Sequence, residues 1–109
     1  MDVLIRFRQI DQELSDWLLS SKAETDEEKE LAGEVSALVA RLGQLRHELA
    51  LAEVKVHALD LRDHTKKLEE LNKKIEGTAK DIKMAKDIIG TTAEVISIAV
   101  AIVGLLSAA

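Results

Sequence analysis

Residues 31–59 read LAGEVSALVARLGQLRHELALAEVKVHAL, and their apolar side chains recur at alternating spacings of four and three. This period places the apolar residues on one face of a long helix, at the a and d positions of a coiled coil. The face is formed by Leu31, Val35, Leu38, Leu42, Leu45, Leu49, Ala52, Val56 and Leu59. We therefore expect a long helix that packs along its whole length against other helices.

A second apolar stripe of the same kind follows later in the chain. It consists of Leu68, Leu71, Ile75, Thr78, Ile82, Ala85, Ile89, Thr92, Ile96, Ala99, Val103 and Leu106. The spacing between Leu59 and Leu68 fits no unbroken heptad frame, so the helix either turns in residues 60–67 or continues with a local change of supercoil. This charged segment contains no Gly or Pro, and both alternatives remain open.

Three helices are predicted, over residues 2–19, 26–60 and 66–107. The first carries apolar residues at helical spacing, namely Val3, Phe7, Ile10, Leu14 and Trp17. The start of the second is marked by Thr25 and Glu28, which have the spacing of a capping box. Within the third, two Gly-Thr segments at 75–81 and 88–94 could stop a helix, but the stripe passes through both in register, which favours a continuous helix.

The expected fold is all-α: an elongated antiparallel helical hairpin or three-helix bundle with heptad packing, in an oligomer. Folding the second helix back on the third sets Leu59 opposite Leu68. An antiparallel second copy crossing at Gly43 would pair Glu34 with Lys55 and Arg41 with Glu48, so an antiparallel dimer is favoured. The predicted interaction residues are Leu31, Val35, Leu38, Leu42, Leu45, Leu49, Leu68, Leu71, Ile75, Ile82, Ile89 and Ile96.

Composition limits the functional classes. A chain of 109 residues is expected to form one domain, and the absence of cysteine excludes disulfides and thiol chemistry. The net charge of −5 argues against nucleic-acid binding, which needs a clustered basic surface. Charged side chains interrupt the apolar residues of the first ten positions, which favours a cytoplasmic protein over an exported one.

The C-terminal tail, residues 95–109, contains no charged side chain. A helix that is apolar all round requires burial on every side or contact with lipid. Extended back to Ile88, the apolar segment is long enough to cross a bilayer, and Lys80, Lys83 and Lys86 precede it. The tail is therefore either buried between subunits or inserted in a membrane. Its predicted contact residues are Val95, Ile98, Val100, Ile102, Val103, Leu105 and Leu106.

No pattern typical of catalysis is present. The serines have no His and acidic partner at a recognisable spacing, and the glycines form no phosphate-binding loop. His57, Asp60 and His64 would share one face of a helix, and zinc accepts such ligands. A surface histidine near an aspartate is common, however, so we predict no metal site, no cofactor and no enzymatic activity.

The sequence thus predicts a non-enzymatic helical interaction or assembly protein that self-associates through coiled-coil packing and its apolar C-terminal helix. The alternative is a membrane-active protein, of a small pore-forming, lysis or tail-anchored type, whose C-terminal helix inserts into a bilayer. The expected partners are further copies of the chain, another protein or a lipid bilayer. The expected location is the cytoplasm, with membrane association through the tail in the alternative case.

Overall fold

The computed structural model describes residues 2–108, and all regular secondary structure in that range is helical, with no strand. Its elements are α1 (Val3–Ser20), α2 (Asp26–Leu51), α3 (Glu53–His57), α4 (Arg62–Glu76), the 3-10 turn η1 (Ile82–Met84) and α5 (Ala85–Ala108). The all-α prediction is therefore confirmed. The capping box at the start of α2 is present, since Thr25 Oγ1 accepts from the Glu28 N–H at 3.1 Å and Glu28 Oε1 accepts from the Thr25 N–H at 3.0 Å.

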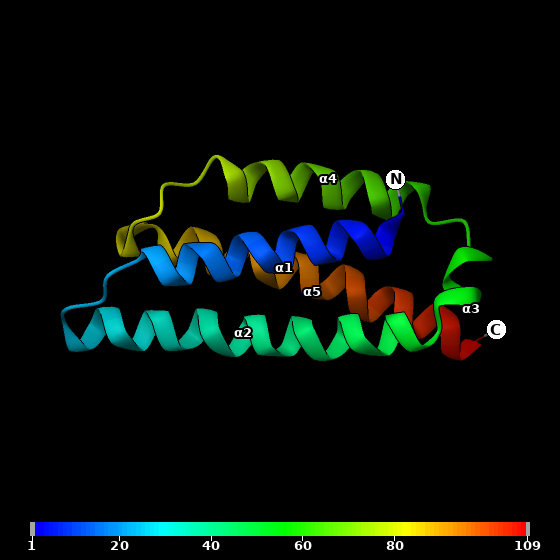
Figure 1. Cartoon of the computed structure of the whole chain (residues 1–109), viewed down its shortest axis with the longest axis horizontal. Coiled ribbons are helices and arrows are strands. Elements are labelled where there is room, and N and C mark those ends of the chain that lie inside the picture. The colour runs from blue at the N-terminus through cyan, green and yellow to red at the C-terminus, as the bar shows by residue number, and fades with distance from the viewer. Residues whose placement is uncertain (1, 109) are drawn as a thin grey trace.

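The four long helices form a bundle with principal extents of 47 × 22 × 17 Å. α1 packs against α2 and α4, and α5 packs against the same two helices from the other side (Figure 1). α2 and α5 run in the same direction, as do α1 and α4. The expected antiparallel hairpin of the second helix with the third does not form, because α2 packs against α5, the later part of that third helix, and the two run parallel.

The second helix ends earlier than expected, at Leu51 instead of near residue 60. Ala52 leaves the helical conformation with φ −105° and ψ 25°, and the short helix α3 leads away from the axis of α2 (Figure 1). Val56 and Leu61 are both buried, so apolar burial holds α3 and the following turn against the core. Through this link the chain passes from the end of α2 to the start of α4. The turn was expected in the charged segment 60–67, but the structure places it earlier, mostly before residue 62.

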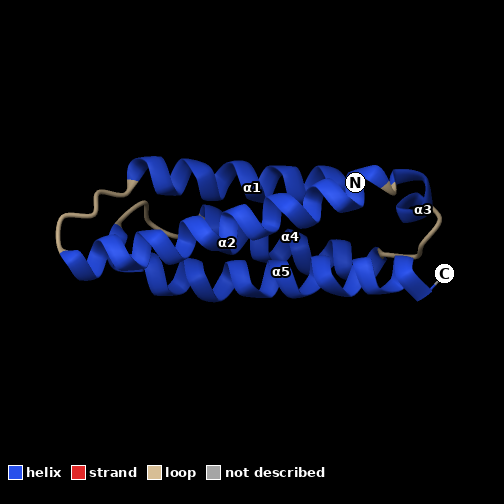
Figure 2. Cartoon of the chain, turned by 90° about the horizontal axis from the view of Figure 1, so that it is seen from below, coloured by secondary structure: helices blue, strands red, loops and turns tan. Residues whose placement is uncertain are grey.

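The third helix is not continuous, which corrects the interpretation of its Gly-Thr segment at residues 75–81. α4 ends at Glu76, and the chain reverses direction before η1 and α5 begin (Figures 1 and 2). The Asp81 side chain accepts from the Lys83 N–H at 3.0 Å and so starts the new helical segment. Ile75 before this break and Ile82 and Ala85 after it are all buried, so the chain on both sides of the turn packs against the core.

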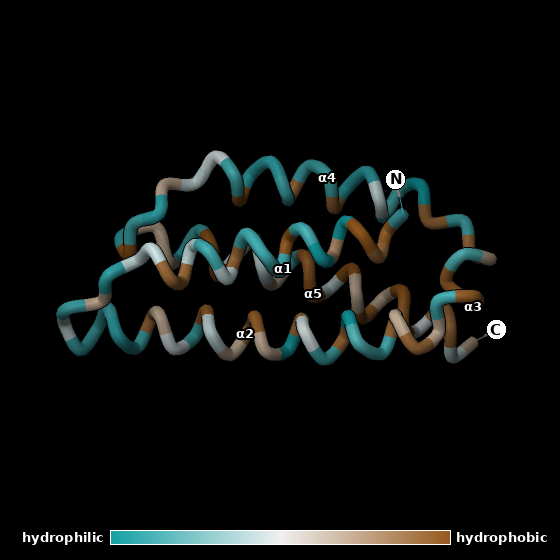
Figure 3. Tube along the Cα trace, viewed as in Figure 1, coloured by the Kyte–Doolittle hydropathy of each residue, from teal (hydrophilic) through white to brown (hydrophobic). Residues whose placement is uncertain are grey.

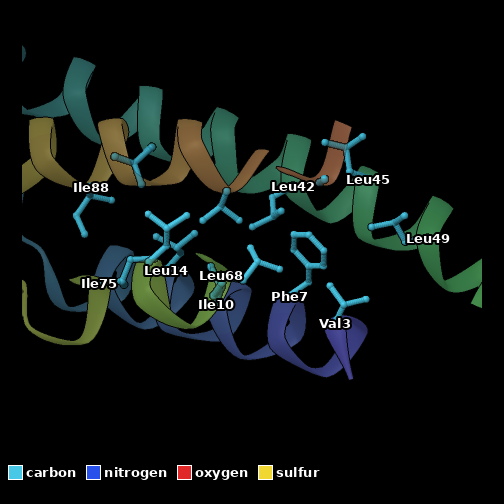
Figure 4. Close-up of a cluster of buried hydrophobic side chains, with 14 of the residues drawn as sticks. Val3, Phe7, Ile10, Leu14, Leu42, Leu45, Leu49, Leu68, Ile75 and Ile88 are labelled. Atoms are coloured by element: carbon cyan, nitrogen blue, oxygen red, sulfur yellow. The ribbon is translucent and has the colours of Figure 1, made fainter. Parts of the chain in front are cut away.

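The core lies between the four helices, whose outer faces carry most of the polar residues (Figures 3 and 4). α1 contributes all five of its predicted apolar residues, and Phe7, Ile10 and Leu14 are completely buried. Full burial of such a side chain stabilises the fold by about 1.5–3 kcal/mol. The predicted interaction residues that are buried inside this single chain are Val35, Leu42, Leu45, Leu49, Leu68, Leu71, Ile75 and Ile82.

The buried face of α5 is rotated from the predicted one. Ile88 and Val95 are fully buried, whereas Ile89 and Ile96, which were expected in the interface, are half-buried. The remaining two predicted interaction residues, Leu31 and Leu38 of α2, are also half-buried. The heptad stripes thus supply the core and the inner edges of this bundle.

Candidate functional site: the outer surface of α2 and α5

The most apolar helix of the protein is incompletely covered by its own chain. The helical stretch Ile82–Ala108 contains an 18-residue window with a mean hydropathy of 2.1, and only 33% of that window is buried. By length and composition it is able to cross a membrane, although the core helix of a soluble bundle meets the same criteria. Contact with a further apolar surface would therefore remove more of this helix from water.

The predicted tail residues divide into three groups. Val95 and Ile102 are fully buried in the core, so they are not available to a partner while the bundle is intact. Half-buried positions are Ile98, Val103 and Leu106. Val100 and Leu105 are 46% and 43% exposed, and they are the large apolar side chains that α5 presents to solvent.

Small residues occupy much of the exposed face of α5. They recur at spacings of three and four, namely Gly90, Ala93, Ser97, Ala101 and Gly104. The neighbouring helix α2 exposes a similar set, namely Gly33, Ser36, Ala37 and Ala40. We refer to these nine residues, together with Val100 and Leu105, as the α2–α5 outer surface. Such surfaces allow the backbone of another helix to approach closely.

The glycines of this surface have no structural role within the chain. A Cβ atom added at Gly33, Gly90 or Gly104 would meet no heavy atom within 4 Å. None of the three has positive φ, so each could be alanine without backbone strain. Glycine inside a helix costs about 0.5–1 kcal/mol relative to alanine, so the folded chain is less stable with glycine at these positions than it would be with alanine.

Charge is concentrated on the other side of the bundle. α4 is predominantly hydrophilic along its outer face, whereas α5 is hydrophobic over much of its length (Figure 3). Some of these charged side chains form ion pairs. Lys73 and Glu69 pair within α4 at 4.0 Å, and Arg46 of α2 lies 3.1 Å from Asp11 of α1. The two helices of the α2–α5 outer surface also expose charged residues, namely Glu34, Arg41 and Glu48 on α2 and Glu94 on α5.

One end of the bundle extends this apolar character. Leu51 at the end of α2 is 76% exposed and Val54 of α3 is 86% exposed. α3 packs against α5, and both lie at the end of the bundle where α5 finishes (Figure 2). A partner that covers the second half of α5 would therefore have further apolar side chains within reach.

The candidate metal ligands are engaged elsewhere. Asp60 accepts from Nε and Nη2 of Arg62 at 3.0 and 2.9 Å, and His57 Nε2 lies 2.9 Å from Oδ2 of Asp2. His64 lies in the first turn of α4. Among the described residues, the fold instead gathers Asp2, Glu53 and His57, whose ligand atoms lie within 4.8 Å of one another.

This group is mostly solvent-exposed, and within it His57 of α3 contacts Asp2 at the start of α1. Burial acts to raise the pKa of Asp2, but the hydrogen bond from the Leu4 N–H and the contact with His57 outweigh it and hold the pKa below its usual value. Sequence spacing could not reveal the group because Asp2 and His57 are 55 residues apart.

The predictions from the sequence rested on the large apolar residues of α2 and did not include its small ones. Their signal was available, since Gly33, Ala37 and Ala40 repeat at helical spacing on the face opposite Val35 and Leu42. The large apolar residues of the same helix form a stronger pattern than these small ones.

The fold and this surface define the class of the protein, an all-α helical bundle with one strongly apolar C-terminal helix. Comparisons of the chain with protein-family models, with curated proteins and with solved structures give no match.

Proposed function

We propose that this protein is a non-enzymatic assembly protein that self-associates through the α2–α5 outer surface. The observation that carries the proposal is the low burial of α5, the most apolar helix, in the single chain. Covering exposed apolar side chains favours association, because it removes apolar area from water. The proposed interface replaces the heptad stripes, which the chain uses for its own core.

The small residues of this surface support helix-to-helix contact between copies. Gly33 and Gly90 leave open space beside their helices, and a second helix could occupy it at short interaxial distance. Each glycine lowers the stability of the isolated chain, and a close contact in the assembly would offset that cost. The four small exposed residues of α2 would then have a role as contact sites for a second copy, which they do not have in the monomer.

Charge favours an antiparallel arrangement of two copies. Arg41 and Glu48 lie seven residues apart on the exposed side of α2. A two-fold axis midway between them would place Arg41 of one copy opposite Glu48 of the other. Such exposed pairs contribute only a few tenths of a kcal/mol, but they select orientation. The predicted pair of Glu34 with Lys55 is less suitable, because Lys55 belongs to α3 and α3 leaves the axis of α2.

The test is the molar mass of the purified protein by sedimentation equilibrium over a range of concentrations. We expect the wild type to form dimers or larger assemblies, and Ala37→Glu and Ser97→Glu to sediment as monomers with unchanged helicity. Lys66→Glu, an exposed position of α4 outside the α2–α5 outer surface, is the control. A monomeric wild type, or variants that assemble as the wild type does, would contradict the proposal.

A second candidate function is insertion of α5 into a bilayer. It is favoured by the uncharged stretch after Glu94 and by Lys80, Lys83 and Lys86 before it, the arrangement expected of a helix that enters lipid from a basic side. Deleting the tail is a poor test, because Val95, Ala99 and Ile102 are core residues. Liposome flotation should instead compare the wild type with Val100→Lys and Leu105→Lys, which change exposed positions.

Leu19→Lys is the control for flotation, since Leu19 is 86% exposed and lies at the opposite end of the bundle from the end of α5. Flotation that is lost in the two α5 variants and retained in Leu19→Lys would support insertion. If the wild type does not float, this second function is excluded under those conditions and self-association remains.

A further inference from the structure

A polar cluster lies between α1 and α4, on the side of the bundle away from the α2–α5 outer surface. The Asn72 side chain is 5% exposed although α4 is an outer helix. With its amide nitrogen directed toward α1, it donates to Oε2 and Oε1 of Glu13 at 2.6 and 3.3 Å. The carboxyl of Glu76 faces that of Glu13 across a groove, and a hydrogen bond between the two is among the causes that raise the pKa of Glu13. Two carboxyl groups can bond to each other only if one of them carries a proton.

A groove of about 390 Å³ surrounds this cluster and is lined by Arg6, Gln9, Gln12, Glu13, Asp16, Asn72 and Glu76. Arg6 enters it from α1, and its Nη1 donates to Oε1 of Gln9 at 3.4 Å. Its Nη2 lies 4.0 Å from Glu69, a distance at the limit of an ion pair. The one cation within the groove is therefore only loosely engaged with Glu69.

The charges around Glu13 are predominantly negative. From α1 it faces Asp16 and Arg6, and from α4 it faces Glu76. Lys80, in the turn after α4, lines an adjoining cavity together with Glu13. On the other side of α1, the basic Arg46 of α2 is paired with Asp11. Burial, the hydrogen bond with Glu76 and the neighbouring carboxylates together raise the pKa of Glu13 to about 8.

We propose that Glu13, Asn72 and Glu76 form a proton-dependent latch between α1 and α4, closed by one proton shared between the two carboxyls. When that proton leaves, two carboxylates face each other in a partly buried site with Asp16 nearby, and their repulsion acts to separate the helices. Asn72 still donates to Glu13 after deprotonation, but it neutralises neither charge. Closure is thus favoured at acidic and neutral pH, and opening is favoured at mildly alkaline pH.

Trp17 provides a built-in reporter of this latch. It is the single tryptophan, lies one helical turn beyond Glu13 on α1 and is 1% exposed. Its indole Nε1 donates to the Ala79 carbonyl just after the end of α4. Separation of α1 from α4 would expose the indole to water and shift its fluorescence emission to longer wavelength.

The experiment is a fluorescence titration of the full-length protein from about pH 6 to about pH 9, below the range in which lysine loses its proton. We expect the emission of the wild type to shift to longer wavelength with a midpoint near 8. Glu13→Gln keeps a hydrogen-bonding side chain without an ionisable group and should show no shift. Glu30→Gln, an exposed change on α2, is the matched control and should titrate as the wild type does.

A second variant keeps the test decisive if Glu13→Gln does not fold. Glu76→Gln removes one of the like charges that oppose ionisation of Glu13, so the midpoint should move to lower pH. The latch is refuted if the wild type shows no transition in this range. It is also refuted if Glu76→Gln and any folded Glu13→Gln protein titrate in the same way as the wild type.

Discussion

Trp17 donates a hydrogen bond from its indole Nε1 to the carbonyl oxygen of Ala79 at 3.0 Å, and so ties the end of α1 to the turn between α4 and η1. The two residues are 62 positions apart, and this turn is where the expected third helix is interrupted. Within the described residues the turn has no regular secondary structure, and the indole is one of the groups that fix its path.

Trp17→Phe should therefore destabilise the bundle even though it preserves an aromatic ring in the core. The lost hydrogen bond is expected to cost about 1 kcal/mol, with a further loss for the smaller ring. Trp17→Ala should cost about 3–5 kcal/mol, because it also leaves a cavity. Urea unfolding followed by far-UV circular dichroism measures both, and equal stabilities for Trp17→Phe and the wild type would show that the bond to Ala79 contributes nothing.

The capping box gives a second prediction, on the start of α2. Thr25→Ala removes the acceptor of the Glu28 N–H and should lower the free energy of unfolding by about 1 kcal/mol. Thr25→Ser retains the hydroxyl and is the matched control, expected to remain close to the wild type. Thermal unfolding of the three proteins at equal concentration would detect the difference, and similar loss in both variants would point to the methyl group instead.

The exposed glycines separate folding stability from assembly. Gly33→Ala and Gly90→Ala should each stabilise the single chain by about 0.5–1 kcal/mol, because a Cβ meets no neighbour at either position. The same methyl groups should weaken self-association if a second helix packs closely there. Unfolding at low concentration and sedimentation at high concentration measure the two effects separately.

Gly77→Ala is the control for these glycine changes. Its Cβ would lie 3.4 Å from the Lys73 carbonyl oxygen, so a smaller gain in stability is expected, and its position in the turn after α4 should leave assembly unchanged. If Gly33→Ala and Gly90→Ala stabilise the chain and leave assembly unaltered, the interface does not use these positions.

The pH dependence of stability follows from Glu13. Burial is the first cause that raises its pKa in the folded state, from an ordinary value of 4.5 to about 8. Between these values the folded chain binds a proton that the unfolded chain has lost, so the free energy of unfolding must fall as the pH rises. The contribution is complete below about 4.5 and is lost by about 8.

Urea titrations at several pH values should show this decline in the wild type and a flatter profile in Glu13→Gln. Because the site is only partly buried, solvent screening limits the size of the effect. A free energy of unfolding that rises over the same pH interval in the wild type would contradict this prediction, because the unfolded chain would then bind more protons than the folded chain.

Much of the local structure could be predicted from the sequence, whereas the pairing of helices could not. The start of α2 depends on Thr25 and Glu28, which are three residues apart, and α1 has a single unambiguous apolar face. An apolar face shows that a helix is packed but does not identify the neighbour. The partner of α2 is decided by the link through α3 and by the turn at residues 77–81.

The rotation of α5 has a physical cause in its sequence. Apolar residues occur there in adjacent pairs, such as Ile88 with Ile89, Val95 with Ile96 and Ile102 with Val103. Either member of each pair could face the core, and the heptad continued from the preceding helix selects the second one. The fold buries the first, since the turn after Glu76 resets the direction and rotation of the helix.

The candidate site was predictable only in part. The uncharged stretch after Glu94 identified α5 as strongly apolar, but the sequence alone did not show that Val95 and Ile102 are buried while Val100 and Leu105 are exposed. The cluster of Glu13 with Asn72 and Glu76 was missed, because its members approach only when α1 and α4 pack side by side. A polar Asn72 between Leu71 and Ile75 was the available signal.

The diagonal link through α3 also affects how the chain folds. Contacts of α1 with α4 and of α2 with α5 join distant parts of the sequence, and such topologies fold more slowly than bundles of consecutive hairpins. During synthesis α1 and α2 are available first, and they hold only part of a core until the later helices arrive. α5 follows them as the most apolar segment and is uncovered at that stage. Three surfaces could then cover α5: the rest of its own chain, another copy of the chain or a lipid surface. The more slowly α5 docks onto its own chain, the more often one of the other two would bind it first.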